Sequence, residues 1–158
     1  SFNIQSFIMR IWLLLSAMAF TLASYSQEKT TYDPALAKKW GADEYGMKQY
    51  VMAFLKKGSG KVDSTQRTQL IQGHLKNIGR LAKEGKLLLA GPFLDNGDLA
   101  GIFVFNVTTI EEARKLVATD PAVKAGLFDM ELHPWYGSAS LMEVVNLHNK
   151  GQKNSITD

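Results

Sequence analysis

The chain has 158 residues, a length that suits one domain with a hydrophobic core. Its formal net charge is only +3, and its lysines are scattered among acidic residues, so the composition argues against nucleic acid as a partner. It contains no cysteine, which excludes a disulfide framework, thiolate catalysis and a cysteine-based metal site.

A continuous apolar segment lies near the start of the sequence. It covers residues 11–23, and Arg10 is the only charged residue before Glu28. The segment is shorter than the roughly 20 residues that span a bilayer, and the small residues after it suit a signal peptidase. The sequence therefore predicts a cleavable signal peptide over residues 1–26 and a periplasmic or secreted protein that keeps no stable membrane anchor. An uncleaved anchor and a buried N-terminal helix are the alternatives.

A polar N-terminal arm over residues 27–47 follows, with a short helix expected at 34–40 because Pro34 suits a first helical position. The domain proper then begins with an apolar strand over residues 49–55. A long helix should follow. Asp63 and Gln66 have the spacing of a capping box at its start, and Gly85 suits its end.

Shorter elements complete the domain. Thr109 and Glu112 form a second capping box, and Pro121 prevents that helix from continuing but can begin one further helical turn. Turn residues at 95–98 separate two apolar segments. The remaining strands are expected at residues 87–90, 102–107 and 128–132, and a partly helical C-terminal tail at 137–158.

The order β-α-β-β-α-β is typical of a ferredoxin-like α+β sheet with its helices on one face. The strand at 102–107 is apolar on both faces, and these helices can cover only one of them. A second copy of the sheet is the expected cover for the other face, which predicts a homodimer. The C-terminal tail is the alternative cover.

His74 and Asp120 are the two residues best suited to chemistry. His74 lies among the apolar positions of the long helix, and imidazole titrates near neutral pH, but this spacing by itself favours a core histidine. Asp120 directly precedes Pro121, as a helix N-cap does. A functional aspartate would instead hold a ring nitrogen of a histidine. The two roles are compatible because a carboxylate has two oxygens.

The sequence predicts no metal site, because His133 and His148 have no metal-ligand spacing with His74. Asp95 and Asp98 are best explained as turn residues.

Several motifs over residues 48–136 resemble those of the YCII-related (YciI-like) family. They are the strand at 50–55, the Gly-His-Leu of 73–75, the Ala-Gly-Pro-Phe of 90–93 and the Asp-Pro-Ala-Val-Lys-Ala-Gly of 120–126. The resemblance implies a ferredoxin-like domain that pairs into a dimeric α/β barrel. It also implies a histidine and an aspartate suspected of enzymatic work, which match His74 and Asp120.

Taken with the resemblance, these residues predict a cofactor-free enzyme that binds a small cyclic or aromatic molecule between sheet and helix. His74 would act as general acid or base in an isomerisation or elimination, and Asp120 would orient its ring. Gly91, Pro92 and Phe93 would shape the mouth of the substrate pocket. A non-catalytic ligand-binding module and a dimerisation scaffold whose tail recruits a partner are the alternatives.

Overall fold

The computed structural model describes residues 31–95 and 97–157, so the predicted signal peptide lies outside the described residues. No helix within the described ranges is long and apolar enough to cross a membrane. The elements below belong to one unit that covers residues 34–158. In chain order they are α2 (Pro34–Trp40), β1 (Met47–Lys57), α3 (Ser64–Lys83), β2 (Leu87–Pro92), β3 (Leu99–Phe105), α4 (Ile110–Val117), α5 (Pro121–Lys124), β4 (Phe128–Ser138), the 3-10 helix η2 (Ala139–Glu143) and α6 (Val144–Gly151).

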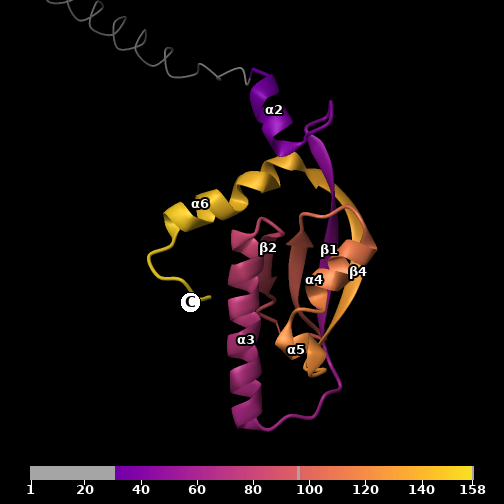
Figure 1. Ribbon diagram of the computed structural model, residues 1–158, viewed down its shortest axis with the longest axis vertical. Coiled ribbons are helices and arrows are strands. Elements are labelled where there is room, and N and C mark those ends of the chain that lie inside the picture. The colour runs from indigo at the N-terminus through magenta and orange to yellow at the C-terminus, as the bar shows by residue number, and fades with distance from the viewer. Residues whose placement is uncertain (1–30, 96, 158) are drawn as a thin grey trace, which may run out of the picture. The chain divides into compact units, whose positions relative to one another are not determined.

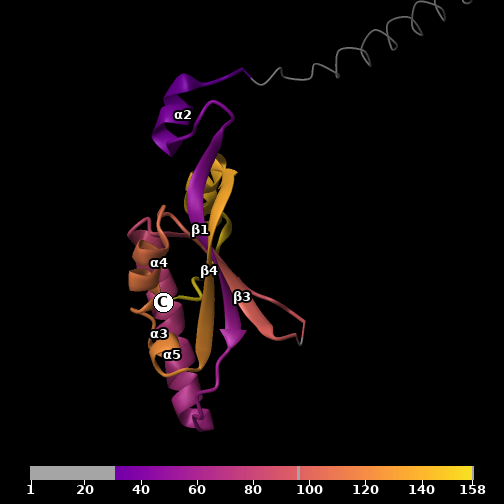
Figure 2. The ribbon, with the colours of Figure 1, turned by 90° about the vertical axis from the view of Figure 1, so that its right-hand side faces the viewer.

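The strands form one antiparallel sheet in the order β2-β3-β1-β4. Helices α3, α4 and α5 lie along one face of this sheet (Figures 1 and 2). In the register, Ala53 in the middle of β1 pairs with Phe103 of β3 and with Leu132 of β4. The α+β class, the strand order and the one-sided helix layer agree with the sequence prediction.

The main core lies between the sheet and the helices. Alternate residues of β1 and β3 point into it, as the two-residue period of a strand requires. Leu81 of α3 and Ala113 of α4 meet them from the helix side. The buried members of this core are Val51, Ala53, Leu55, Leu81, Leu87, Phe103, Phe105, Val107 and Ala113.

The helix ends follow the predicted caps. Asp63 accepts a hydrogen bond from the backbone N–H of Gln66, whose side chain reaches back to Asp63, so the capping box of α3 is complete. Gly85 follows the helix with φ = 67°, a conformation that glycine adopts without the strain a Cβ brings. Thr109 caps α4 by accepting from the backbone N–H of Glu112 at 3.2 Å, and its hydroxyl donates to the carboxylate of Glu112 at 2.9 Å.

Strand β4 is longer than the sequence predicts. It continues through Pro134 to Ser138, whereas the alternation of apolar and polar residues stops near His133. Proline is a poor residue for a central strand because it lacks the N–H of the ladder. β4 is an outer strand with a neighbour on one side only, so the ladder tolerates Pro134 opposite Val51.

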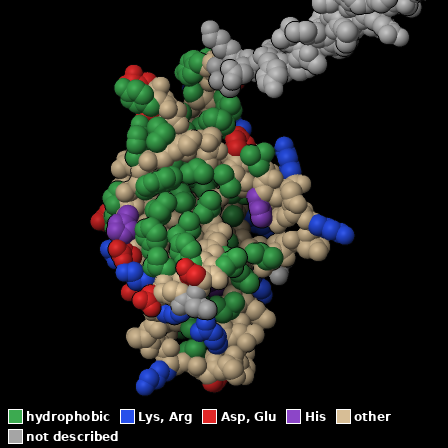
Figure 3. Space-filling model, turned by 180° about the vertical axis from the view of Figure 1, so that it is seen from behind, with side chains coloured by type: hydrophobic (Ala, Val, Ile, Leu, Met, Phe, Trp, Pro, Cys, Tyr) green, Lys and Arg blue, Asp and Glu red, His purple; other side chains and the backbone are tan. Residues whose placement is uncertain are grey.

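The second face of the sheet is partly covered by the C-terminal tail. Tyr50, Leu88 and Val104 are buried there, and Leu141 and Met142 of η2 pack against them. Figure 3 shows the apolar side chains that gather on this side of the molecule. The alternative prediction, that the C-terminal tail covers this face, is therefore correct for the end of the face near Tyr50. Farther along the same face, Met52, Phe54 and Ile102 are half-buried.

The N-terminal arm is fixed to the end of the domain. The indole Nε1 of Trp40 donates to Glu143 of η2 at 3.0 Å, and Lys39 forms an ion pair with the same carboxylate. Tyr136 of β4 donates a hydrogen bond to Asp43. Contacts with both β4 and η2 thus hold the segment that joins α2 to β1.

Candidate functional site

Helix α3 presents His74 to the sheet between two aromatic rings. The helix turns its apolar face inward, and His74 is only 7% exposed. Its imidazole stacks on Phe103 of β3, with ring centres 5.7 Å apart and planes at 20°. Phe128 of β4 lies 5.2 Å away on a tilted plane. Rings from two different strands therefore fix the orientation of the imidazole.

Asp120 is fully buried at the start of α5 and uses both carboxylate oxygens. Its Oδ1 accepts from the backbone N–H groups of Ala122 at 2.9 Å and Val123 at 3.4 Å. Its Oδ2 lies 2.7 Å from Nδ1 of His74. The predicted cap and the predicted contact with a histidine are both confirmed, since one oxygen serves each.

The surroundings of Asp120 keep its carboxyl group ionised. Burial raises the pKa of Asp120, but the hydrogen bond and charge of His74, together with the N–H groups of Ala122 and Val123, lower that pKa overall. An ionised carboxylate can only accept, so Nδ1 of His74 must donate the proton between them. In the neutral imidazole, Nε2 is then the nitrogen with the free lone pair.

Nε2 of His74 has no hydrogen-bond partner among the described residues. Within residues 31–95 and 97–157, every buried side-chain nitrogen or oxygen has a hydrogen-bond partner. The contacts of His74 in that part of the chain involve Nδ1 and the ring faces, and none of them uses Nε2. A histidine can act as a general base when one ring nitrogen is oriented by a hydrogen bond and the other carries a lone pair that can accept a proton.

A polar network that the sequence reading did not identify supports Asp120. Asn77, one turn after His74 on α3, places its Nδ2 at 3.5 Å from Asp120 Oδ2. Arg80 donates to Oδ1 of Asn77 at 2.8 Å and to Oγ1 of Thr119 at 2.9 Å. The spacing of Asn77 and Arg80 three and six residues after His74 is the signal that could have indicated them.

Close approaches at glycines hold α5 against α3 and hold the residues after α5 against the loop after β1. A Cβ on Gly73 would lie 2.7 Å from Cγ of Pro121, so glycine next to His74 lets the two helices meet. On the other side, the loop after β1 packs on the residues that follow α5. Gly58 N–H donates to Leu127 O at 3.0 Å, and Gly60 N–H donates to Gly126 O at 2.9 Å.

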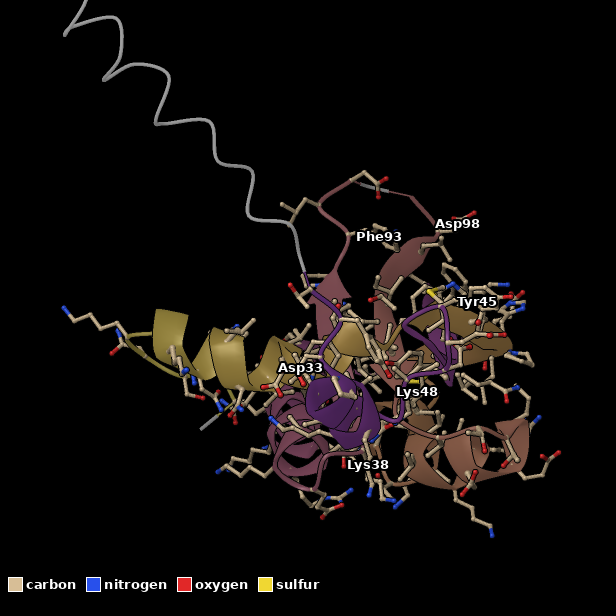
Figure 4. All side chains as sticks on the ribbon, turned by 90° about the horizontal axis from the view of Figure 1, so that it is seen from above. Asp33, Lys38, Tyr45, Lys48, Phe93 and Asp98 are labelled. Atoms are coloured by element: carbon tan, nitrogen blue, oxygen red, sulfur yellow. The ribbon has the colours of Figure 1, made fainter. Side chains whose placement is uncertain are left out.

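Gly91, Pro92 and Phe93 lie on β2 and just after it, next to the strand β3 that carries Phe103. They end β2 and begin the β2–β3 connection, where Phe93 is 41% exposed and its N–H donates to Ala100 O. Figure 4 shows Phe93 on a hairpin that projects away from the helix layer. No hydrogen bond or ring contact among the described residues joins this segment to His74. Its role at the mouth of a pocket stays a prediction.

No group of three or more His, Cys, Asp or Glu side chains in the described part of the chain is arranged to hold a metal ion.

The topology and the buried pair define an α+β protein with a histidine held by an aspartate between its sheet and its helices. A model of the YCII-related domain matches residues 49–136, more than half of the sequence, and the chain belongs to this family.

The chain is also similar to two individual proteins. The chain is 31% identical over 65 residues to the uncharacterised protein YjpA of Bacillus subtilis (strain 168), a match that covers 41% of this chain and 74% of YjpA. A solved structure of 5-chloro-2-hydroxyhydroquinone dehydrochlorinase (TftG) from Burkholderia phenoliruptrix AC1100, in complex with 2,5-dihydroxybenzoquinone, is 26% identical. That match covers 54% of this chain and 92% of TftG, with a TM-score of 0.41.

Proposed function

We propose that the chain is a cofactor-free enzyme that performs acid–base chemistry on a small cyclic or aromatic molecule, with His74 as the proton-transferring group. The observation that supports this best is that the two ring nitrogens of His74 have different surroundings. Nδ1 is held at 2.7 Å by the buried carboxylate of Asp120, and Nε2 has no partner in the described part of the chain. The YCII-related family and the aromatic rings around His74 are compatible with a small organic substrate.

The proposed reaction begins with removal of a proton from a substrate carbon by Nε2 of His74. The imidazolium that forms is stabilised by the ionised Asp120 on the opposite side of the ring. Return of the proton to another substrate atom completes an isomerisation. Departure of a leaving group from the carbanion completes an elimination instead, and the histidine then releases its proton to solvent. Gly91, Pro92 and Phe93 are the proposed rim of the substrate site.

Solvent exchange tests this function without knowledge of the product. Small cyclic and aromatic carbon acids would be incubated with the protein in D2O, and deuterium incorporation would be followed by NMR. We expect catalysed exchange for at least one compound, and a rate lowered by about 100-fold or more in His74→Ala. His133→Ala is the matched control, because His133 is exposed and its recorded contacts among the described residues are with Glu131 and the ring of Phe54, away from Asp120. Undiminished exchange in His74→Ala would exclude this mechanism.

The alternative function is a non-catalytic module that binds a small ligand or a partner. The low exposure of His74 and the full set of partners around Asp120 favour it, because these features also suit a purely structural histidine. Ligand binding by the wild type with no exchange of any compound would support this alternative.

We also propose that a second copy of the chain covers the rest of the open sheet face. Half-buried Met52, Phe54 and Ile102 would lie at the centre of that contact. Sedimentation of residues 27–158 should give a dimer, and Phe54→Glu should give a monomer. The control Ile156→Glu changes an exposed apolar residue in the C-terminal tail and should stay dimeric. A monomeric wild type would contradict the proposal.

We further propose that the protein is exported by means of a cleavable signal peptide. The apolar segment at residues 11–23 supports this proposal.

A further inference from the structure

The chain segment that carries Asp120 touches helix α3 on both sides of that residue, and α5 lies beside α3 (Figures 1 and 2). Just after Asp120, Cγ of Pro121 lies 2.7 Å from the place that a Cβ on Gly73 would occupy. Just before it, Oγ1 of Thr119 accepts a hydrogen bond from Nη2 of Arg80 at 2.9 Å. Two attachments to α3 therefore bracket the aspartate.

The attachment before Asp120 is the polar network of Asn77, Arg80 and Thr119. Nη2 of Arg80 donates both to Oδ1 of Asn77, at 2.8 Å, and to Oγ1 of Thr119, and these two oxygens lie 3.0 Å apart. The same hydroxyl oxygen lies 2.6 Å from the carbonyl oxygen of Leu116 in α4. The network therefore joins α3 to the turn between α4 and α5.

The polar network also fixes which way round the amide of Asn77 lies. A guanidinium can only donate, so the amide atom that faces Arg80 must be the oxygen. The NH2 group of Asn77 then faces Oδ2 of Asp120 at 3.5 Å, the oxygen that also accepts the Nδ1 proton of His74. Asn77 is buried, so water competes little for these groups. The amide thus brings a second donor to the oxygen that His74 uses, whereas the reverse orientation would place an oxygen against a carboxylate.

Arg80 holds the polar network from the surface of α3. Its Nη1 forms an ion pair with Glu84 at 2.8 Å, one helical turn later, while Nη2 is directed at Asn77 and Thr119. The planar guanidinium keeps both directions at once, and a lysine ammonium has no such fixed fork. The charge alone therefore cannot replace the arginine.

We infer that Asn77, Arg80 and Thr119 are positioning residues that hold the carboxylate of Asp120 against Nδ1 of His74. They fix the main chain just before the carboxylate and add a donor to its Oδ2, so the imidazole has its acceptor in one place and one orientation. Their effect on the reaction rests on the proposed function. Their effect on the hydrogen bond between Asp120 and His74 does not, and it is measurable in the protein without a substrate.

Thr119→Val tests the inference, because it removes the hydroxyl and keeps a side chain of similar shape. Thr119 is exposed, so the variant should fold. In the labelled protein, the NMR signal of the Nδ1 proton of His74 reports the hydrogen bond to Asp120, and the exchange of this proton with water reports how often that bond opens. In Thr119→Val the signal should move upfield, as it does when a hydrogen bond weakens, and the exchange should be about tenfold faster. Thr119→Ser restores the hydroxyl and should give the wild-type signal and rate.

Two further variants separate positioning from general stability. Thr68→Val removes another exposed threonine hydroxyl from α3, one that donates to the backbone oxygen of Ser64 at 3.0 Å, and it should leave the His74 signal unchanged. Arg80→Lys keeps the charge and loses the fork of donors, so it should change the signal as Thr119→Val does. A hydroxyl that only stabilised the fold would lower the free energy of unfolding without moving the signal.

An unmoved His74 signal in Thr119→Val, or a Thr119→Ser variant as altered as Thr119→Val, would overturn the inference. Exchange of a carbon acid in D2O distinguishes this failure from that of the proposed function. If a compound exchanges in the wild type, its rate should fall about tenfold in Thr119→Val and return in Thr119→Ser. An undiminished rate in Thr119→Val would overturn the inference and leave the proposed function standing. If no compound exchanges, the proposed function fails, and the signal of His74 still decides the positioning role.

Discussion

Replacement of Asp120 by alanine should lower the free energy of unfolding by about 3 kcal/mol. The substitution removes the N-cap of α5, a loss of about 1 kcal/mol, and a buried charge-assisted hydrogen bond to His74, a loss of about 2 kcal/mol. It also leaves Nδ1 of His74 and Nδ2 of Asn77 without their acceptor. Chemical denaturation monitored by circular dichroism would measure the change.

The matched control is Asp63→Ala, which removes the other aspartate that caps a helix. Asp63 is exposed and has no buried histidine partner, so its loss should cost only about 1 kcal/mol. Equal losses in the two variants would mean that the contact between His74 and Asp120 adds nothing to stability beyond the cap.

The stability that Asp120 contributes should also depend on pH. Its folded pKa lies below the ordinary value of 3.8, so the ionised form stabilises the fold above that pH, and this contribution is lost as the pH falls through the folded pKa. In Asp120→Asn the cap is kept but the charge is absent. The difference in unfolding free energy between wild type and Asp120→Asn should therefore shrink as the pH falls below 3.8.

Replacement of Gly58 by alanine should cost about 2 kcal/mol, because there is no room for the added carbon. A Cβ at Gly58 would lie 2.0 Å from the carbonyl oxygen of Gly126, which is backbone and cannot rotate away. The loop or the residues after α5 would have to move, and with them the helix that Asp120 caps. We expect a lower melting temperature and altered NMR signals at His74.

Gly151→Ala provides the control for Gly58→Ala. No atom lies within 4 Å of the Cβ that alanine would place at Gly151, and its backbone is not in the left-handed region. Its stability should stay within about 0.5 kcal/mol of the wild type. A Gly58→Ala variant as stable as Gly151→Ala would show that the loop adjusts without cost.

Local sequence signals predict the elements of this fold well and their long-range contacts poorly. Capping residues such as Asp63 and Thr109 define helix starts because the partner of each cap lies three residues away in the same chain segment. The extension of β4 across Pro134 could not be read locally, since it depends on β4 being an outer strand of the sheet.

The same distinction applies to the candidate site. His74 and Asp120 are separated by 46 positions, and spacing alone favoured structural roles for both; only the motifs of the family indicated that they belong together. Helical spacing on α3 could have indicated Asn77 and Arg80, but no local feature shows that Thr119, a threonine after a different helix, contacts both of them. The position of Phe93 depends on how the β2–β3 hairpin leaves the sheet, which no local pattern determines.

The prolines of the two outer strands have a consequence for self-association. β2 ends at Pro92 and β4 contains Pro134, and neither residue has the N–H that an added strand would need. Pairing of sheets edge to edge, the usual first step toward fibrils, is thereby interrupted on both sides. Addition of a strand at these edges is therefore disfavoured, and the proposed contact between two copies uses the flat surface of the sheet instead.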